Sequence, residues 1–121
     1  MTGDRRWEVR LTPAADNDTR DILRWTEAHF GATQARVYAK TLGRATDALK
    51  AGPRVAGARV RNDLGEGIMA LHVARQGRKG RHLLFYRIGS PAEPPTIDVL
   101  RILHDSMDPT RHLAHDASDG L

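Results

Sequence analysis

The 121-residue sequence contains no cysteine, which excludes a disulfide framework, a zinc–thiolate centre and a thiol nucleophile. No window approaches the roughly 18 consecutive apolar residues of a membrane-spanning helix. The first residues, MTGDRRWEVR, lack the apolar core of a secretory signal. We therefore expect a cytoplasmic protein without a membrane partner, and one domain with a single modest core.

Acidic residues are missing from a long internal stretch, because none occurs between Glu66 and Glu93. The basic residues of this interval are Arg75, Arg78, Lys79, Arg81 and Arg87, with His72 and His82 beside them. Residues 1–103 carry 18 basic and 11 acidic residues, a net charge of +7, whereas the end of the chain is acidic. This balance suggests a polyanionic partner, either nucleic acid or an acidic protein segment, with an ordinary solvated surface as the alternative.

Aromatic residues are also scarce. The chain has six, and none lies in QGRKG (76–80), the turn between two strand-like runs. The turn of this hairpin therefore offers no aromatic side chain on which single-stranded bases could stack, which counts against nucleic-acid binding by the chain alone. A docking surface explains the charge of the hairpin better than an active site does.

Two helices are predicted near the start of the chain, after a short strand at WEVRL (7–11). Thr12 followed by Pro13 marks the beginning of the first helix, and Gly31 marks its end. The second is expected from about 33 to 51, with close packing at its interior Gly43. Its core stripe is Tyr38, Leu42, Ala45 and Leu49.

The second half of the chain predicts a sheet. The glycine- and proline-rich stretch 51–67 is expected to be loop, and strands are expected at 68–75, 81–88 and 96–103. The order β-α-α-β-β-β predicts an α+β fold in which a helical hairpin packs on a small antiparallel sheet.

A row of like charges runs along the second helix. Arg36, Lys40 and Arg44 recur four residues apart, a spacing at which like charges repel by a few tenths of a kcal/mol per pair. A helix that accepts this repulsion is suited to presenting charge to a partner. The alternative is a plain solvated face.

The order of elements and several motifs resemble the ParE branch of the RelE/ParE toxin superfamily, over Trp7 to about Leu113. The motifs are HFG at the end of the first helix, QARVYAKTL (34–42), LHVARQGRKGRHLLFYRI (71–88) and IDVLRILHDSMDPTRHL (97–113). The last is the most specific, because toxins of this branch close with an arginine, a short apolar step, a histidine and an aspartate. Here these are Arg101, His104 and Asp108.

The resemblance implies the toxin of a bacterial type II system concerned with plasmid stabilisation. A co-expressed, acidic, ParD-like antitoxin would fold over it in a hetero-oligomer. From the residues, we expect an apolar helix of this antitoxin to bind the groove beside the helical hairpin, because apolar surface and the row of charges on the second helix would otherwise be uncompensated. ParE-type toxins are described as inhibitors of DNA gyrase, whereas RelE-type relatives cut messenger RNA on the ribosome. The fold is shared, so the residues must decide between these activities.

Cleavage of RNA needs a base, a cation for the phosphate and an acid for the leaving oxygen. A ribonuclease would use Arg75, Arg81, Arg101 and His104, with Arg87 and Tyr86 as further candidates, although Tyr86 reads more readily as a core residue. Scattered arginines around one histidine are not a catalytic constellation, so binding to gyrase is the preferred reading and ribonuclease the alternative. No metal or cofactor is expected.

The predicted docking surface combines three segments. Its residues are Arg36, Lys40, Arg44, Arg75, Arg78, Lys79, Arg81, Arg101, His104 and Asp108. The tail beyond Leu103 is expected to belong to it, with a mobile end from about 114 to 121. A third hypothesis is an antitoxin-bound module without residual toxicity that serves in autoregulation.

Overall fold

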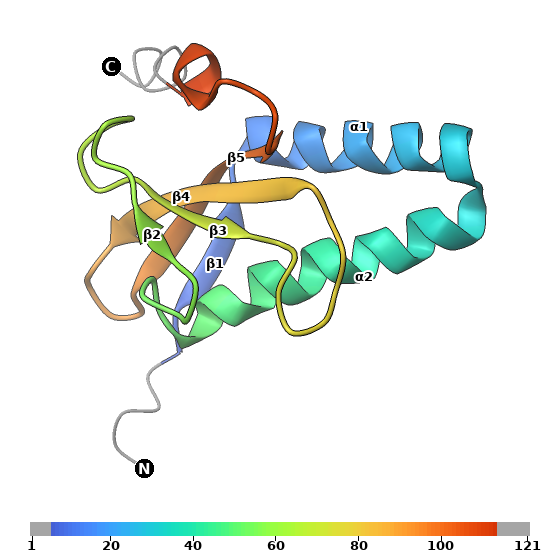
Figure 1. The fold of residues 1–121 in the computed structure, drawn as a ribbon. Helices are drawn as coiled ribbons and strands as arrows, with labels where there is room; N and C mark the ends of the chain where they lie inside the picture. The colour runs from blue at the N-terminus through green and yellow to red at the C-terminus, as the bar shows by residue number, and fades with distance from the viewer. Residues whose placement is uncertain (1–5, 114–121) are drawn as a thin grey trace.

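A computed structural model describes residues 6–113. The chain forms a five-stranded sheet and two long helices that run side by side as a hairpin away from one side of the sheet (Figure 1). The elements are β1 (Glu8–Leu11), α1 (Pro13–Phe30), α2 (Ala32–Ala48), the short 3-10 helix η1 (Leu49–Ala51), β2 (Arg59–Val60), β3 (Met69–His72), β4 (His82–Ser90) and β5 (Thr96–His104). The predicted α+β fold is confirmed.

The sheet has the order β1-β5-β4-β3-β2 and is mixed rather than wholly antiparallel. Strands β2 to β5 pair in antiparallel fashion, whereas β1 joins β5 in parallel, with Glu8 opposite Thr96. The prediction that 51–67 is entirely loop is wrong at one point, because Arg59–Val60 forms strand β2, which pairs with β3 at the edge of the sheet. Two residues are too few to produce a periodic pattern, so the sequence carries no signal for this strand.

The start of α1 is fixed by Thr12, as predicted. Its side chain accepts a hydrogen bond from the Ala15 N–H at 3.1 Å, and Pro13 occupies the first turn, where a missing N–H costs nothing. The Thr12 hydroxyl also donates to the carbonyl of Leu100 at 2.9 Å, which ties the helix start to β5. Gly31 separates the helices with φ of 93°, a conformation that favours glycine.

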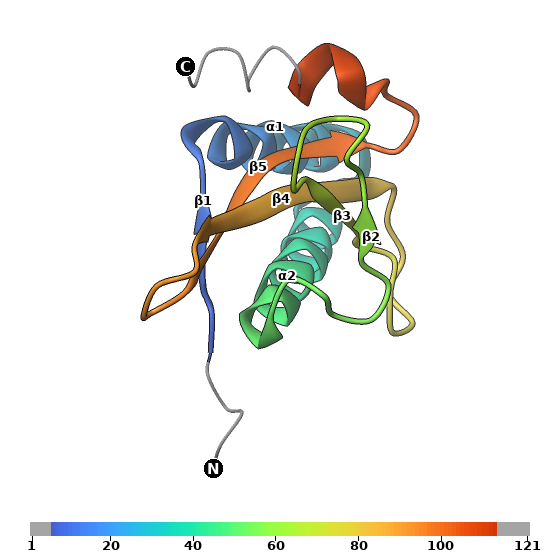
Figure 2. The ribbon, with the colours of Figure 1, turned by 90° about the vertical axis from the view of Figure 1, so that its left-hand side faces the viewer.

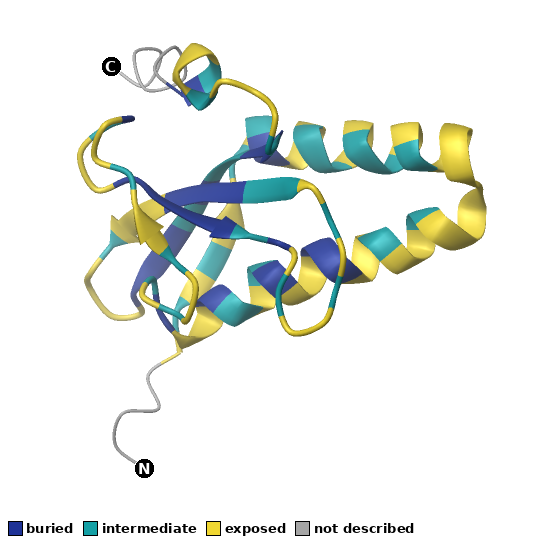
Figure 3. Cartoon of the chain, viewed as in Figure 1, coloured by how far each residue is buried: buried dark blue, intermediate teal, exposed yellow. Residues whose placement is uncertain are grey.

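The two helices cover one face of the sheet (Figure 2). The predicted stripe of α2 is confirmed, with Leu42, Ala45 and Leu49 buried against the sheet and Tyr38 half-buried. Most of the buried residues lie in the sheet and on the inner sides of the helices near it, while the far end of the hairpin is exposed (Figure 3). The close packing expected at Gly43 is wrong, because a Cβ there would meet no atom within 4 Å.

The opposite face of the sheet has its own small cluster. Phe85 and Leu103 are buried there beneath the loop before β3 and beneath Leu113, which lies 1% exposed in the helical residues 109–113. The segment after β5 therefore belongs to the folded body at least as far as Leu113. The predicted mobile end at 114–121 lies outside the described residues.

Candidate functional site

The basic loop between β3 and β4 folds against α2. Arg78 donates through Nε to the Thr41 hydroxyl at 3.0 Å and through Nη2 to the Val37 carbonyl at 3.4 Å. Gly80 passes so close that a Cβ would lie 2.9 Å from the Tyr38 hydroxyl oxygen. The turn chemistry of QGRKG therefore serves a close contact between loop and helix, in addition to reversing the chain.

Other basic residues of this hairpin also make internal contacts. Arg75 donates to the carbonyl of Ala56 at 3.3 Å, and Arg81 forms a paired contact with the carboxylate of Asp105. The side chains of Lys79 and Arg87 are exposed and form no ion pair or hydrogen bond within residues 6–113. Part of the charge that the sequence assigned to docking thus holds the hairpin in place.

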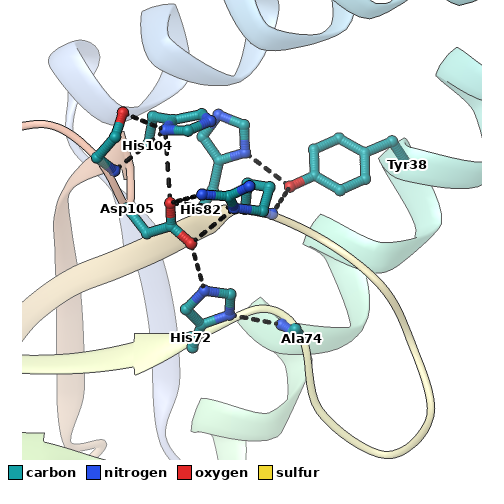
Figure 4. Close-up of polar contacts among 8 residues, drawn as sticks. Tyr38, His72, Ala74, His82, His104 and Asp105 are labelled. Atoms are coloured by element: carbon teal, nitrogen blue, oxygen red, sulfur yellow. Dashed lines mark hydrogen bonds and ion pairs between the residues drawn. The ribbon is translucent and has the colours of Figure 1, made fainter.

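A polar cluster occupies the end of β5, where β3, β4 and α2 meet (Figure 4). The Tyr38 hydroxyl lies 2.6 Å from Nδ1 of His82, and the rings of His82 and His104 meet edge to face with centroids 5.2 Å apart. Asp105 accepts from Nε of Arg81 at 3.0 Å and lies 3.2 Å from Nε2 of His72. We call these six residues the histidine cluster: Tyr38, His72, Arg81, His82, His104 and Asp105.

The electrostatics of the histidine cluster follow from burial and pairing. Burial, with repulsion from His104, lowers the pKa of His82 from 6.5 to about 4, so this ring is neutral at pH 7. Hydrogen bonds from Arg81 and then His72 lower the pKa of Asp105 from 3.8 to about 2, so the carboxylate is ionised. Burial raises the pKa of the Tyr38 phenol. The cluster is therefore a neutral histidine beside a compensated ion pair.

The chemistry open to this cluster is narrow. The Tyr38 hydroxyl accepts the backbone N–H of Arg81, so its own proton is available for Nδ1 of His82. Arg81, the arginine of the cluster, is already paired with Asp105. Over residues 6–113 no group of histidine and acidic side chains has the arrangement of a metal site. The contacts fix the ends of three strands.

Arg101 lies elsewhere than its predicted docking role requires. Its guanidinium pairs with the carboxylate of Asp18 on α1, at 2.8 Å from Nε and 2.9 Å from Nη2, and both side chains are less than a fifth exposed. The same carboxylate accepts the backbone N–H of Ile102 at 2.9 Å. Arg101 joins β5 to α1, which corrects its assignment to a partner surface and to a phosphate site.

The remaining candidates after β5 divide between cap and surface. Asp108 accepts from the backbone N–H and the hydroxyl of Thr110, contacts that lower its pKa and cap the helical residues from 109. Asp108 is exposed as well, so its docking role stays a prediction. His104 is half-buried, and its Nδ1 lies 2.7 Å from the Ser106 hydroxyl.

Tyr86, in β4, is a core residue, as the sequence indicated. Its hydroxyl donates to the Pro53 carbonyl at 2.7 Å, and burial raises its pKa to about 12.

The row Arg36, Lys40 and Arg44 is exposed along α2, as expected. Arg36 also lies at the rim of an open groove between the two helices. The groove is lined by Arg20, Leu23, Arg24, Glu27, Ala32, Ala35, Arg36 and Ala39. A floor of leucine and alanine with arginines beside it suits an amphipathic helix with acidic flanks.

Sequence reasoning overlooked Tyr38, His82, Asp105 and Asp18 as interacting residues. His82 lies directly opposite His104 in the β4–β5 register, and this pairing would have brought the two rings together had the register been known. Nothing in the sequence links Asp18 to Arg101, which lies 83 residues further along the chain.

Comparison with known proteins places these features in a family. The family described as the ParE toxin of type II toxin–antitoxin system, parDE, matches residues 9–109. Toxin ParE1 of Mycobacterium tuberculosis is 35% identical over 103 residues, which cover 85% of this chain and 94% of the relative. Toxin ParE1 of Caulobacter vibrioides is 29% identical over 104 residues, covering 86% and 95%.

A solved structure is similar in fold. The crystal structure of the toxin–antitoxin complex RelBE2 from Mycobacterium tuberculosis superposes with a TM-score of 0.52 at 23% identity, and covers 82% of this chain and 98% of that one. In the part of the chain described, no helix is both long and apolar enough to cross a membrane. Because the family matches nearly all of the folded body and a relative matches at 35% identity, the chain belongs to the ParE toxins of type II toxin–antitoxin systems.

Proposed function

We propose that this toxin inhibits DNA gyrase by binding to it, without chemistry of its own, and that a ParD-like antitoxin neutralises it. The observation that carries the proposal is the pairing of the arginines. Arg101 is held by Asp18 and Arg81 by Asp105, so neither guanidinium is left uncompensated for the charge of a scissile phosphate. A toxin in which both of these arginines are already paired with a carboxylate is better suited to blocking a target than to cutting RNA.

The names of the relatives support the same direction. Two similar toxins are named ParE1, and the family description refers to parDE, a name that pairs the toxin with ParD. An antitoxin of this kind would lay an amphipathic helix in the groove between α1 and α2. Leu23 and three alanines would contact its apolar side, and Arg36, at the rim of the groove, would face a carboxylate.

One observation favours a second function, ribosome-dependent cleavage of messenger RNA. The histidine cluster brings His82, His104 and Tyr38 together at the edge of the sheet, and a neutral histidine is able to accept a proton. The alternative therefore keeps His104 from the sequence prediction and adds His82, which the structure places beside it, as acid–base residues.

A dose series of wild type and His104→Ala separates the two functions. Each protein is titrated into a gyrase supercoiling assay and into a translating-ribosome cleavage assay. If His104 belongs to a docking surface, its loss costs about 1–2 kcal/mol of affinity, and higher toxin concentration restores full gyrase inhibition. If His104 transfers a proton, the activity at saturating concentration falls by roughly 10²–10⁴-fold.

We expect the first pattern, with trapped cleaved DNA and no messenger cuts. Arg59→Ala, an exposed basic residue on β2 outside the site, is the matched control and should follow the wild-type curve. A collapse of saturating activity in either assay would reject binding and support catalysis. Silence of the wild type in both assays would support an antitoxin-bound module without toxicity.

A further inference from the structure

The structure joins two basic segments that are separate in the sequence. Arg78 in the β3–β4 loop bonds to Thr41 and Val37 of α2, so the loop lies directly beside the helix that carries the row of charges. Figure 1 shows the loop passing across α2. We call the combined surface the basic face; its residues are Arg36, Lys40, Arg44, Arg78 and Lys79.

The charges of the basic face are not compensated by acids. Among the described residues, Lys40, Arg44 and Lys79 form no ion pair, and the one acid of α2, Asp47, pairs with Lys50 at 3.3 Å. The neighbouring helix is different. On α1, Arg20 pairs with Asp16 at 3.0 Å and Arg24 with Asp21 at 3.6 Å.

This contrast between adjacent helices indicates that the charge of α2 serves an external anion. Successive charged positions on α2 are about 6 Å apart along the axis, because four residues rise by that amount. The contacts of Arg78 hold a further cation beside this row. The basic face is therefore an extended array of cations and suits a polymer of charges better than a single small anion.

The composition of the basic face fits a nucleic-acid backbone better than a protein. Protein interfaces are enriched in arginine and aromatic residues and depleted of lysine. The arginines of this face suit either partner, but Lys40 and Lys79 and the lack of an aromatic side chain favour a nucleic-acid backbone. Over the length of α2, all of which is described, Val37 is the one large apolar side chain that is strongly exposed, at 47%. Binding of a single strand relies on stacked aromatic residues, so their absence favours a duplex.

We propose that the basic face binds the phosphate backbone of duplex DNA without sequence preference. Arginine and lysine contacts to phosphates position a protein on a duplex and carry no sequence information. The two basic segments are each too small for this role and become sufficient when the loop packs on α2. DNA binding belongs to the toxin chain itself and does not require that gyrase be its target.

The experiment measures binding of a short fluorescent duplex of mixed sequence to the full chain by anisotropy, between about 50 and 200 mM salt. Five phosphate contacts predict a slope of log K against log salt of about −4.5, since each contributes about −0.9. Replacing Lys40→Gln and Lys79→Gln together should reduce the slope to about −2.7 and weaken binding at low salt by roughly tenfold or more.

The matched control is Arg10→Gln with Arg61→Gln, which removes the same formal charge from residues paired with Asp98 and Asp63. This control should keep the wild-type slope and affinity. Equal losses in the two double variants would overturn the proposal, because net charge alone would then explain binding. Tighter binding of a single strand than of the duplex would also overturn it.

Poly-glutamate is the rival probe, because it represents an acidic protein segment. If it binds with the affinity of the duplex and loses affinity to the same two substitutions, the face belongs to an acidic polypeptide and the proposal fails. Gyrase is absent from every arm, so these results are independent of the supercoiling assay. Thermal melting of each variant verifies that the exposed substitutions leave the fold intact.

Discussion

His82 is held neutral by its surroundings, and this has a consequence for stability. The unfolded chain takes up a proton on this histidine near pH 6.5, whereas the folded chain does so only near pH 4. The contribution of His82 to the free energy of unfolding is therefore fully present above about pH 6.5. It is lost as the pH falls from about 6.5 to about 4. The depressed pKa of Asp105, about 2, acts separately, because its contribution is lost only between pH 3.8 and 2.

Replacing His82→Asn should remove the pH dependence in the upper window, because asparagine can still bond Tyr38 but does not titrate. We expect the free energy of unfolding of the wild type to fall by about 2 kcal/mol more than that of the variant between pH 7 and pH 4, after screening by solvent at this partly exposed site. Urea denaturation of both proteins between pH 7 and pH 4 measures this difference in the free energy of unfolding. Tyr38→Phe is the control: it should lose about 1 kcal/mol at pH 7 and keep most of the pH dependence, because His82 still titrates there. Parallel curves for wild type and His82→Asn would disprove the role of this ring.

The ion pair of Arg101 and Asp18 gives a second prediction at the scale of the residue. Arg101→Ala leaves a mostly buried carboxylate unpaired, so the free energy of unfolding should fall by roughly 3 kcal/mol. The double variant Asp18→Leu with Arg101→Leu should recover a large part of this loss, because no buried charge is left without a partner. Urea denaturation of the single and double variants tests this. A stable Arg101→Ala protein with weakened target binding would instead restore the docking role.

The segment after β5 is an element in its own right. Asp108 caps its helical residues, and Leu113 fills the small cluster on the outer face of the sheet, against Phe85 and Leu103. A segment with so few anchors depends heavily on each of them.

Truncation tests this element. Removing 114–121 deletes none of the contacts described and should leave the folded body intact. Removing everything after Leu103 exposes the outer cluster and takes away Asp105, so β5 should become unstable or toxicity should be lost. Leu113→Ala alone should cost about 2–4 kcal/mol in urea denaturation. A chain cut after Leu103 that is both stable and fully toxic would contradict this account.

Local chemistry explains which elements the sequence could predict. The Thr12 cap, the proline after it and the positive φ of Gly31 act within one turn, so α1 was predicted with its true ends. The stripe of α2 follows from a period of 3.6 residues. Strand β2, the parallel pairing of β1, the bond between Arg101 and Asp18 and the contact of Arg78 with α2 all depend on residues far apart in the chain. No local pattern encodes those.

The whole molecule carries an unbalanced field, with a net charge of +7 over residues 1–103. If the antitoxin is acidic, as proposed, a field of this sign steers it toward the toxin before the two surfaces touch and raises the association rate. Charge reversal at Arg36 and Arg44 together should slow association and weaken its salt dependence, with a smaller change in the dissociation rate. Stopped-flow mixing with the antitoxin at several salt concentrations measures both. Wild-type association rate and salt slope in the variant would mean that the row is only solvated surface.

The parallel pairing of β1 with β5 has a consequence for folding during synthesis on the ribosome. Thr12 bonds to Leu100, a partner 88 residues later, so the sheet cannot close until almost the whole folded body has left the ribosome. Contacts between such distant parts of a chain also form slowly once both are available. A nascent chain that has made only the helical hairpin lacks β4, β5 and the histidine cluster between them. The toxin therefore acquires its active shape late in synthesis, which gives a co-expressed antitoxin time to be present when that shape appears.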